Sequence, residues 1–359
     1  MNRSFKILTI ALLAMILIAA LPVAAQEGVK SVCLVTDLGR VNDGTFNQYA
    51  HEGATLAVED FDLEYKFIET QSETDYAANI NTCIDEGFDV VITVGFLIAD
   101  TTNEIAEANP DVYFLGIDQF VLDGPENYVG IQFREDQAGF LAGVLAALVA
   151  EENDEDTVAG VYGVDIPPVK KYRNGFEQGA LYINPDIKLL GVYIDSFVAP
   201  DRGASAAEQF IGEGASVIFG AGGPTGSGGI QAAAQKEVFV IGVDQDEYLT
   251  TFGAGETPGA EFVISSAMKR VDMGVYALIA MLAEGMMDDF PGGNVYLMGA
   301  AEEGVGLAPK HDADIPDEIY EQVQEVFDLM VEGEVETGVD PVTGDLLEDE
   351  ELETESADG

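Results

Sequence analysis

Three aspartates follow apolar runs that predict buried strands of a parallel sheet. Asp37 comes after the run 32–35, Asp118 lies in the sequence GIDQ, and Asp244 lies in GVDQD. Open α/β sheets bind ligands at the carboxyl ends of their strands. Carboxylates accept hydrogen bonds from sugar hydroxyls and from ring N–H groups. A single aspartate after a strand usually caps a helix or turn, but three in this position favour recognition of a polar ligand.

An aromatic and an amide side chain follow the first of these aspartates. The stretch 31–48 predicts a strand, then a glycine-bearing loop with Asn42 and Asp43 as turn or cap residues, then a helix that starts at Phe46 and Asn47. An ordinary strand–helix loop with a cap would have the same pattern. Aromatic faces stack on planar bases. We take two aromatic residues, Phe46 and Phe197, and one lysine, Lys269, as candidate neighbours of the aspartates.

Other chemical signals in the chain are weak. The glycine-rich stretch 220–229 follows a predicted strand, but it lacks the lysine of a phosphate-binding loop. It fits better with close approach of the backbone to a neutral ligand. His51 and His311 have no histidine or cysteine at metal-ligand spacing, and no nucleophile elbow occurs. The sequence therefore predicts no catalytic residue, no metal and no cofactor.

Charge and cysteine content narrow the possible partners. The chain has 66 Asp and Glu against 15 Lys and Arg, a formal net charge of -51. Such a surface repels phosphate backbones, so we expect no nucleic-acid partner. Cys33 lies in the first predicted strand and Cys83 on the second predicted helix. They could pair in an exported protein, but their apolar surroundings favour two buried, unpaired side chains.

The amino terminus has the features of a secretory signal. Arg3 and Lys6 precede the apolar run 7–21, and small residues at 23–25 fit cleavage after Ala25. An uncleaved membrane anchor is the alternative, but the run is short for a span. No cysteine stands at the cleavage point, so lipid attachment there is not supported. We expect an exported protein, either periplasmic or associated with the cell surface.

Strands and helices alternate along the rest of the chain, which predicts βαβ units and parallel sheets. The alternation restarts after a charged break at 151–156, and this indicates two Rossmann-like lobes. Small residues in the helix 137–150 should allow close packing. We expect three chain crossings between the lobes, near Phe133, near 246–259 and near 295–304. The expected division is a signal peptide at 1–25, a first lobe at 30–133 plus about 255–295, a second lobe at 134–250 plus about 296–332, and a disordered acidic tail at 333–359.

Five motifs, in this order, resemble those of one known family. They are TDLGRVNDGTFNQ, GIDQ, FGAGGPTGSGGIQAA, IGVDQD and ISSAMKRVDMGVY. The chain resembles the basic membrane protein family, the PnrA-like substrate-binding proteins of ABC importers, over roughly residues 30–335. Many members bind purine nucleosides, and the family has the type I periplasmic-binding-protein fold. The resemblance implies a small-molecule ligand and, as protein partners, the permease subunits of an ABC transporter.

The resemblance also assigns roles to residues. Asp37, Asn47 and Asp118 would bond the base, with Phe46 and Phe197 stacked on its faces. Gly222, Asp244 and Lys269 would hold the ribose. The alternatives are a binding protein for a sugar, a flavin or another heterocycle, and a nucleoside-processing enzyme on a doubly wound fold. The export signal and the missing catalytic groups favour a binding protein. The chain departs from the family in lacking a cysteine for lipid attachment.

Overall fold

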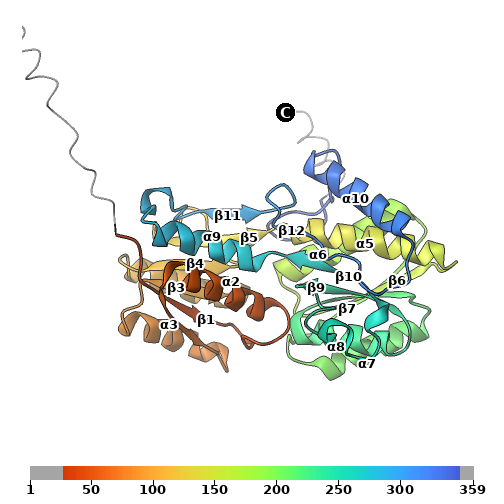
Figure 1. Cartoon of the computed structure of the whole chain (residues 1–359), viewed down its shortest axis with the longest axis horizontal. Coiled ribbons are helices and arrows are strands. Elements are labelled where there is room, and N and C mark those ends of the chain that lie inside the picture. Colours follow the sequence, from red (N-terminus) through yellow and green to blue (C-terminus); the bar gives the residue numbers. More distant parts are fainter. Residues whose placement is uncertain (1–26, 348–359) are drawn as a thin grey trace, which may run out of the picture.

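The computed structural model describes residues 27–347, which build two six-stranded sheets (Figure 1). The first sheet has the order β11-β5-β4-β3-β1-β2 and the second the order β12-β10-β9-β8-β6-β7. Neighbouring strands are parallel, except that β10 and β12 are antiparallel. The strands of the first sheet are β1 (Ser31–Val35), β2 (Glu64–Ile68), β3 (Val90–Val94), β4 (Tyr113–Ile117), β5 (Tyr128–Phe133) and β11 (Val295–Met298). Those of the second are β6 (Thr157–Tyr162), β7 (Lys188–Tyr193), β8 (Val217–Ala221), β9 (Phe239–Asp244), β10 (Val263–Lys269) and β12 (Val305–Leu307).

Helices cover both faces of each sheet, and we call each sheet with its helices a lobe. The first lobe has α2 (Phe46–Phe61), α3 (Tyr76–Asp85), α4 (Ala99–Ala108) and α9 (Val271–Ala283). The second has α5 (Glu135–Glu152), α6 (Pro167–Ile183), α7 (Pro200–Gly212), α8 (Gly223–Ala234) and α10 (Asp317–Val331). Helix α2 packs on α9, and α5 packs on α6. The core under these two pairs is continuous from one lobe to the other. The architecture confirms the predicted α/β class and the two Rossmann-like lobes.

The chain crosses between the lobes three times. The crossings lie between β5 and α5, between β10 and α9, and between β11 and β12. The predicted second crossing is therefore misplaced, because β10 pairs with β9 in the second lobe and not with a strand of the first. The first lobe gains only α9 and β11 from the late part of the chain. An apolar strand pattern shows that a strand is buried, but it does not show which sheet the strand joins.

The first two crossings are built alike. Arg134, directly after β5, donates to both carboxylate oxygens of Asp136 at 2.8 and 2.7 Å. Arg270, directly after β10, donates to both oxygens of Asp272 at 2.9 and 2.9 Å. Each aspartate also lies in the first turn of a helix, where negative charge is favourable. Each crossing is thus held by a bidentate ion pair between residues two apart.

Glycines bring α5 and α6 into close contact, as the small residues of this segment predict. A Cβ atom on Gly143 would lie 2.0 Å from the carbonyl oxygen of Phe176. One on Gly179 would lie 1.9 Å from that of Phe140. Larger side chains would therefore force the two helices apart. Within residues 27–347, the helices are all too short or too polar to cross a membrane.

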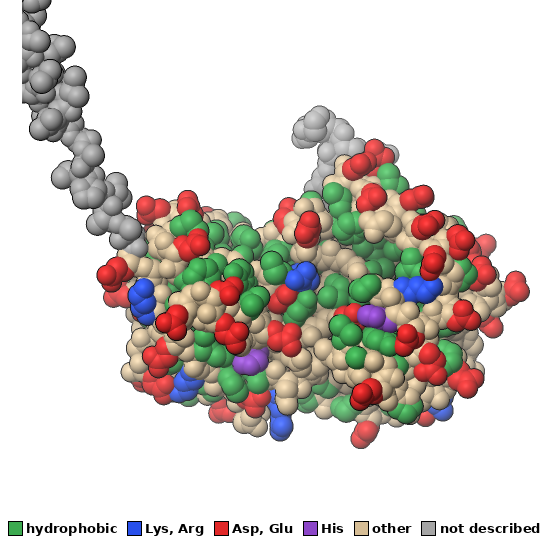
Figure 2. Space-filling view, in the orientation of Figure 1, with side chains coloured by type: hydrophobic (Ala, Val, Ile, Leu, Met, Phe, Trp, Pro, Cys, Tyr) green, Lys and Arg blue, Asp and Glu red, His purple; other side chains and the backbone are tan. Residues whose placement is uncertain are grey.

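Acidic side chains are spread over the surface seen in Figure 2, and Lys and Arg side chains are few there. The acidic groups on this face therefore have few basic neighbours, in keeping with the net charge of -51. Repulsion among such charges opposes the compact state and is screened by salt.

Cys33 and Cys83 form a disulfide. The interpretation of these residues as unpaired side chains was therefore wrong. Helix α3 packs on β1, which brings Cys83 against Cys33 in a fully buried contact. Apolar surroundings describe this position correctly, but they do not distinguish a thiol from a disulfide.

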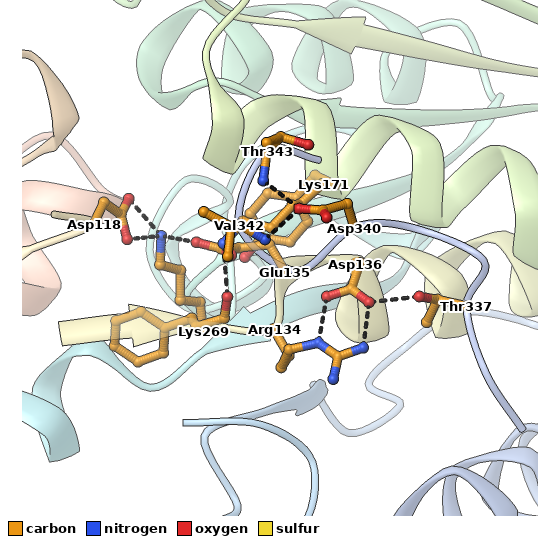
Figure 3. Close-up of polar contacts among 12 residues, drawn as sticks. Asp118, Arg134, Glu135, Asp136, Lys171, Lys269, Thr337, Asp340, Val342 and Thr343 are labelled. Atoms are coloured by element: carbon orange, nitrogen blue, oxygen red, sulfur yellow. Dashed lines mark hydrogen bonds and ion pairs between the residues drawn. The ribbon is translucent and has the colours of Figure 1, made fainter. Parts of the chain in front are cut away.

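Part of the predicted disordered tail is folded. Thr337 donates to Asp136 at 2.5 Å (Figure 3), and Asn174 donates to the carbonyl oxygen of Gly344 at 2.5 Å. Val339 is 2% exposed. We call residues 334–347 the C-terminal strap, because they run over the first turns of α5 and α6. The prediction of disorder is wrong for the strap, and residues 348–359 lie outside the described part, as does the predicted signal peptide.

Truncation after Gly333 is expected to lower the melting temperature, which removal of a disordered tail would not do. The deletion would leave the buried carboxylate of Asp136 without its hydroxyl partner. Thr337→Val, which removes only that hydroxyl, should cost about 1–3 kcal/mol. Thermal unfolding of both variants, beside one truncated after Leu347, separates the strap from residues 348–359. A wild-type melting temperature for the Gly333 truncation would show that the strap adds no stability.

Candidate ligand-binding site

The carboxyl ends of both sheets face a cavity between the lobes. It is lined by the loops that follow β1, β3 and β4 on one side and β6, β7, β8 and β9 on the other. All of the residues predicted from the sequence to bind ligand line this one cavity: Asp37, Phe46, Asn47, Asp118, Phe197, Gly222, Asp244 and Lys269. The cavity lies where the strand-end rule for α/β sheets places ligands.

On the first lobe, the carboxylate of Asp43 fixes the amide of Asn47. Asp43 accepts from the Nδ2 of Asn47 at 3.0 Å and from the backbone N–H groups of Thr45, Asn47 and Gln48. Asn47 also lowers the pKa of the neighbouring Asp37, against the larger upward effect of burial. Because an ionised carboxylate only accepts, the nitrogen of this amide is turned toward Asp43. Its Oδ1 is buried without a hydrogen-bond partner among residues 27–347 and is left as an acceptor.

On the second lobe, an aspartate and a phenylalanine line the opposite wall. The hydroxyl of Tyr172 donates to Asp244 at 3.2 Å. The ring of Phe197 lies against Gly163, where a Cβ atom would be 2.5 Å from the ring. The cavity therefore has one phenylalanine from each lobe, Phe46 and Phe197, with carboxylates on both sides.

Asp118 and Asp244 have the same local structure, as the likeness of GIDQ and GVDQD suggests. Each stands at the end of the fourth strand of its half, with left-handed φ values of 61° and 63°. The glutamine after each is buried. Gln119 donates to the carbonyl oxygens of Thr93 and Gly95, while Gln245 donates across the cleft to Thr45 at 2.8 Å. The left-handed turn directs both aspartates to the cavity.

Lys269 joins the two lobes at the cavity. Its Nζ lies 2.6 Å from Asp118 of the first lobe and 2.7 Å from Glu135 of the second. It also lies 4.8 Å from the centroid of the Phe46 ring, a distance typical of a cation–π contact. The lobes also meet where Thr250 donates to the carbonyl oxygen of Gly44 at 2.8 Å, next to the bond between Gln245 and Thr45. The lobes are therefore closed on one another.

Burial dominates the acid–base properties of the cavity. It raises the pKa of Asp37 to about 7, with the charges of Asp43 and Asp118 adding to the effect. It raises the pKa of Asp244 to about 7 and that of Asp118 to about 6, although Lys269 opposes both shifts. Burial lowers the pKa of Lys269, but Asp118 and Glu135 outweigh it, so the net shift of this pKa is upward. Lys269 is therefore charged at neutral pH.

The structure adds residues that the sequence alone did not single out. Tyr172 contributes from the second turn of α6, and Ile166, Pro168 and Val169 line the cavity beside it. The only sequence signal here is that Ile166 lies in the loop after a predicted strand; Tyr172 lies inside the following helix and has no such signal. The glycine-rich stretch is mostly helical, since α8 begins at Gly223. Gly228 packs against the backbone of Pro200 in α7, and of the glycines in this stretch only Gly222 and Gly223 line the cavity.

Comparison with known proteins identifies the class to which this chain belongs. Residues 30–338 match the family model of the PnrA-like substrate-binding proteins of ABC transporters. The chain belongs to this family. It is therefore an ABC transporter substrate-binding protein, and such proteins act outside the cytoplasm.

Relatives and solved structures support the same class. The chain is 30% identical over 324 residues to the "CD4+ T-cell-stimulating antigen" of Listeria monocytogenes, covering 87% of this chain and 88% of that protein. It is 29% identical to the "ABC transporter nucleoside-binding protein BmpA" of Lactococcus lactis, covering 76% and 80%. A solute-binding protein of an ABC transporter system from Aeropyrum pernix is similar in structure, with a TM-score of 0.75, 25% identity and coverage of 86% and 92%. These similarities confirm the type I periplasmic-binding-protein fold and support a binding protein over an enzyme.

Proposed function

We propose that this protein binds a purine nucleoside between its lobes and delivers it to the permease subunits of an ABC importer. The observation that carries the proposal is the cavity itself, in which a phenylalanine from each lobe is combined with buried carboxylates and one lysine. A planar base has two faces for aromatic contact and an edge with N–H donors. The name of the relative from Lactococcus lactis adds support.

The base would lie against the first lobe. Phe46 and Phe197 would contact its two faces, and Asp37 and Asp118 would accept from its N–H groups. The Oδ1 of Asn47 adds a third acceptor, whose orientation is fixed by Asp43. This wall is rich in acceptors, so it suits a base edge that presents several donors.

The ribose would lie against the second lobe. Asp244 would accept from ribose hydroxyls, Lys269 would donate to them, and Gly222 would let the backbone approach closely. A Cβ atom on Gly222 would lie 2.3 Å from the backbone nitrogen of Gly163. Among the described residues that line the cavity, Lys269 is the only Lys or Arg, and it is already paired with two carboxylates. A phosphate would find no uncompensated cation on these walls, so nucleotides should bind poorly.

Calorimetry with matched ligands tests the proposal. The panel contains purine nucleosides, their free bases, ribose, the 5′-monophosphates, a flavin and simple sugars. The expected result is tight binding of a nucleoside and weak binding of its base, its sugar and its monophosphate. Mass spectrometry of the same mixtures should show unmodified nucleoside. Tight binding of a sugar alone, or release of free base, would replace this proposal by another ligand or by catalysis.

Opposite pH trends are expected for stability and for binding. Asp37 and Asp244 have pKa values of about 7, above the ordinary 3.8, so the folded, empty protein holds protons that the unfolded chain releases. Its stability should therefore fall as the pH rises through the interval between about 4 and about 7. Binding requires the carboxylate form as acceptor, so the affinity should rise from about pH 5 to about pH 8.

Thermal unfolding and calorimetry across this interval check both trends. The two carboxyls also feel the neighbouring groups Asp43, Asp118, Tyr172 and Lys269. These neighbours are unchanged in the variant described next. Asp37→Asn combined with Asp244→Asn should make this decrease in stability smaller; part of it should remain, because burial also raises the pKa of Asp118 to about 6 and that of Glu247 to about 7. An affinity for the wild-type protein that is constant over the whole range would contradict recognition by these carboxylates.

A further inference from the structure

Lys269 is the first member of a chain of buried charges that extends away from the cavity (Figure 3). One oxygen of Glu135 lies 2.7 Å from Lys269, and the other lies 2.5 Å from the Nζ of Lys171. Lys171 also donates to the carbonyl oxygen of Phe133 at 2.8 Å. The side chains of Lys269, Glu135 and Lys171 are 2%, 0% and 1% exposed. Glu135 and Lys171 do not line the cavity.

The positions of these residues in the two lobes determine which charges stay together when the lobes separate. Glu135 opens α5 at the first crossing, Lys269 ends β10 at the second crossing, and Lys171 lies in α6. All three belong to the second lobe, whereas Asp118 belongs to the first. If the lobes separate, Glu135 remains beside Lys269 and Asp118 departs. Glu135 is therefore the partner that can hold Lys269 in place in both arrangements.

The charges in the chain balance only when all members are present. Two lysines alternate with two carboxylates, so each buried charge has an opposite neighbour. A lysine has three N–H donors. Both oxygens of Asp118 lie 2.6 Å from the Nζ of Lys269 and can share one N–H group, and Glu135 can take another, which leaves the third for a ligand. With Glu135 removed, Lys269 would turn fully to Asp118, while removal of Lys171 would leave Glu135 to draw Lys269 away from the cavity.

We propose that Glu135 and Lys171 are positioning residues for ligand binding, which act by holding the ammonium group of Lys269 where it meets a ribose hydroxyl. The inference rests on the proposed function for the identity of that ligand. It assigns to two residues outside the cavity a share in the preference for a nucleoside over its free base.

The test replaces the pair by apolar side chains of similar size, Glu135→Leu with Lys171→Met. Such exchanges of buried ion pairs are often neutral for stability, so the variant should fold. Its affinity for a nucleoside should fall about tenfold or more, while that for the free base should change little. The ratio of the two affinities is the decisive readout, because a general loss of stability does not alter it selectively.

Asp136→Asn is the matched control. Asp136 is the next residue of the same helix and equally buried, and it bonds Arg134 and Thr337 outside the cavity. The control should lower the melting temperature and keep the affinity ratio. If the wild-type protein prefers nucleosides and the double variant keeps the wild-type ratio, the inference is overturned.

A second measurement does not depend on the ligand. In protein with ¹⁵N-labelled lysine, the buried ammonium of Lys269 should give a protected signal that Lys269→Met removes. Glu135→Leu with Lys171→Met should shift or abolish this signal, and Asp136→Asn should leave it. An unchanged signal would overturn the inference. If the wild-type protein binds no nucleoside, the proposed function fails, and this measurement still decides whether Glu135 and Lys171 hold Lys269.

Discussion

Asp118→Asn and Asp244→Asn are each expected to weaken nucleoside binding by about ten- to a hundredfold. Both carboxylates are buried at the cavity, and hydrogen bonds to a charged acceptor are stronger than those to a neutral one. Asparagine is the suitable replacement because both positions have left-handed backbone angles, which asparagine tolerates better than alanine. Affinities are measured by calorimetry and stabilities by thermal unfolding of the same samples.

The two variants should lose different parts of ligand recognition. Asp118→Asn should blunt the choice among bases, whereas Asp244→Asn should reduce the advantage of a nucleoside over its free base. Asp62→Asn is the control, since Asp62 has a left-handed φ of 53° at the end of α2 and does not line the cavity. If both cavity variants bind like the wild type, the assignment of the site is wrong. A lower melting temperature with unchanged affinity would mean that these aspartates only shape their turns.

Removal of the disulfide, by Cys33→Ala with Cys83→Ala, is expected to cost about 4 kcal/mol of stability. The two cysteines are 50 residues apart in the chain, and in the chain-entropy account the cost grows with loop length. Both residues are fully buried and neither lines the cavity. The affinity of the folded variant should therefore stay close to that of the wild type.

Denaturant unfolding of the wild-type protein, with and without reductant, gives an independent measure of the same effect. Reductant should lower the unfolding midpoint of the wild type and leave that of the double variant unchanged. A midpoint of the double variant equal to that of the oxidised wild type would show that the bond does not stabilise the fold.

The location of the site could be predicted from the sequence because it depends on a simple rule. Residues directly after apolar strands, such as Asp37, Asp118 and Asp244, are brought together by any parallel sheet. Tyr172 was missed because it reaches the cavity from within a helix, where its sequence position carries no comparable signal. The role of Asp43 in fixing Asn47 was also hidden, since it depends on the direction of two side chains.

Pairings over long distances in the chain could not be predicted. The strap is rich in acidic residues, and its order depends on Asp136 and Asn174, which lie far away in the sequence. The assignment of β10 to the second lobe depends on pairing with β9, for which its own apolar pattern gives no preference. In each case the local composition was interpreted correctly, but the structure of the segment depends on residues that are distant in the sequence.

The exchange of helices at the first two crossings has a consequence for how the protein folds. Helix α5 follows the strands of the first lobe but packs in the second, and α9 follows those of the second but packs in the first. The part of the chain before the first crossing therefore lacks α9, one of the helices that cover its sheet, whereas the helices of the second lobe all follow that crossing. A fragment ending after β5 would leave one face of the first sheet without α9, exposing Ala50 and Ala54 on α2. The first lobe therefore completes its core only when the late part of the chain has been added. Because the core is continuous between the lobes, the protein should unfold in one cooperative transition although it is built from two similar parts.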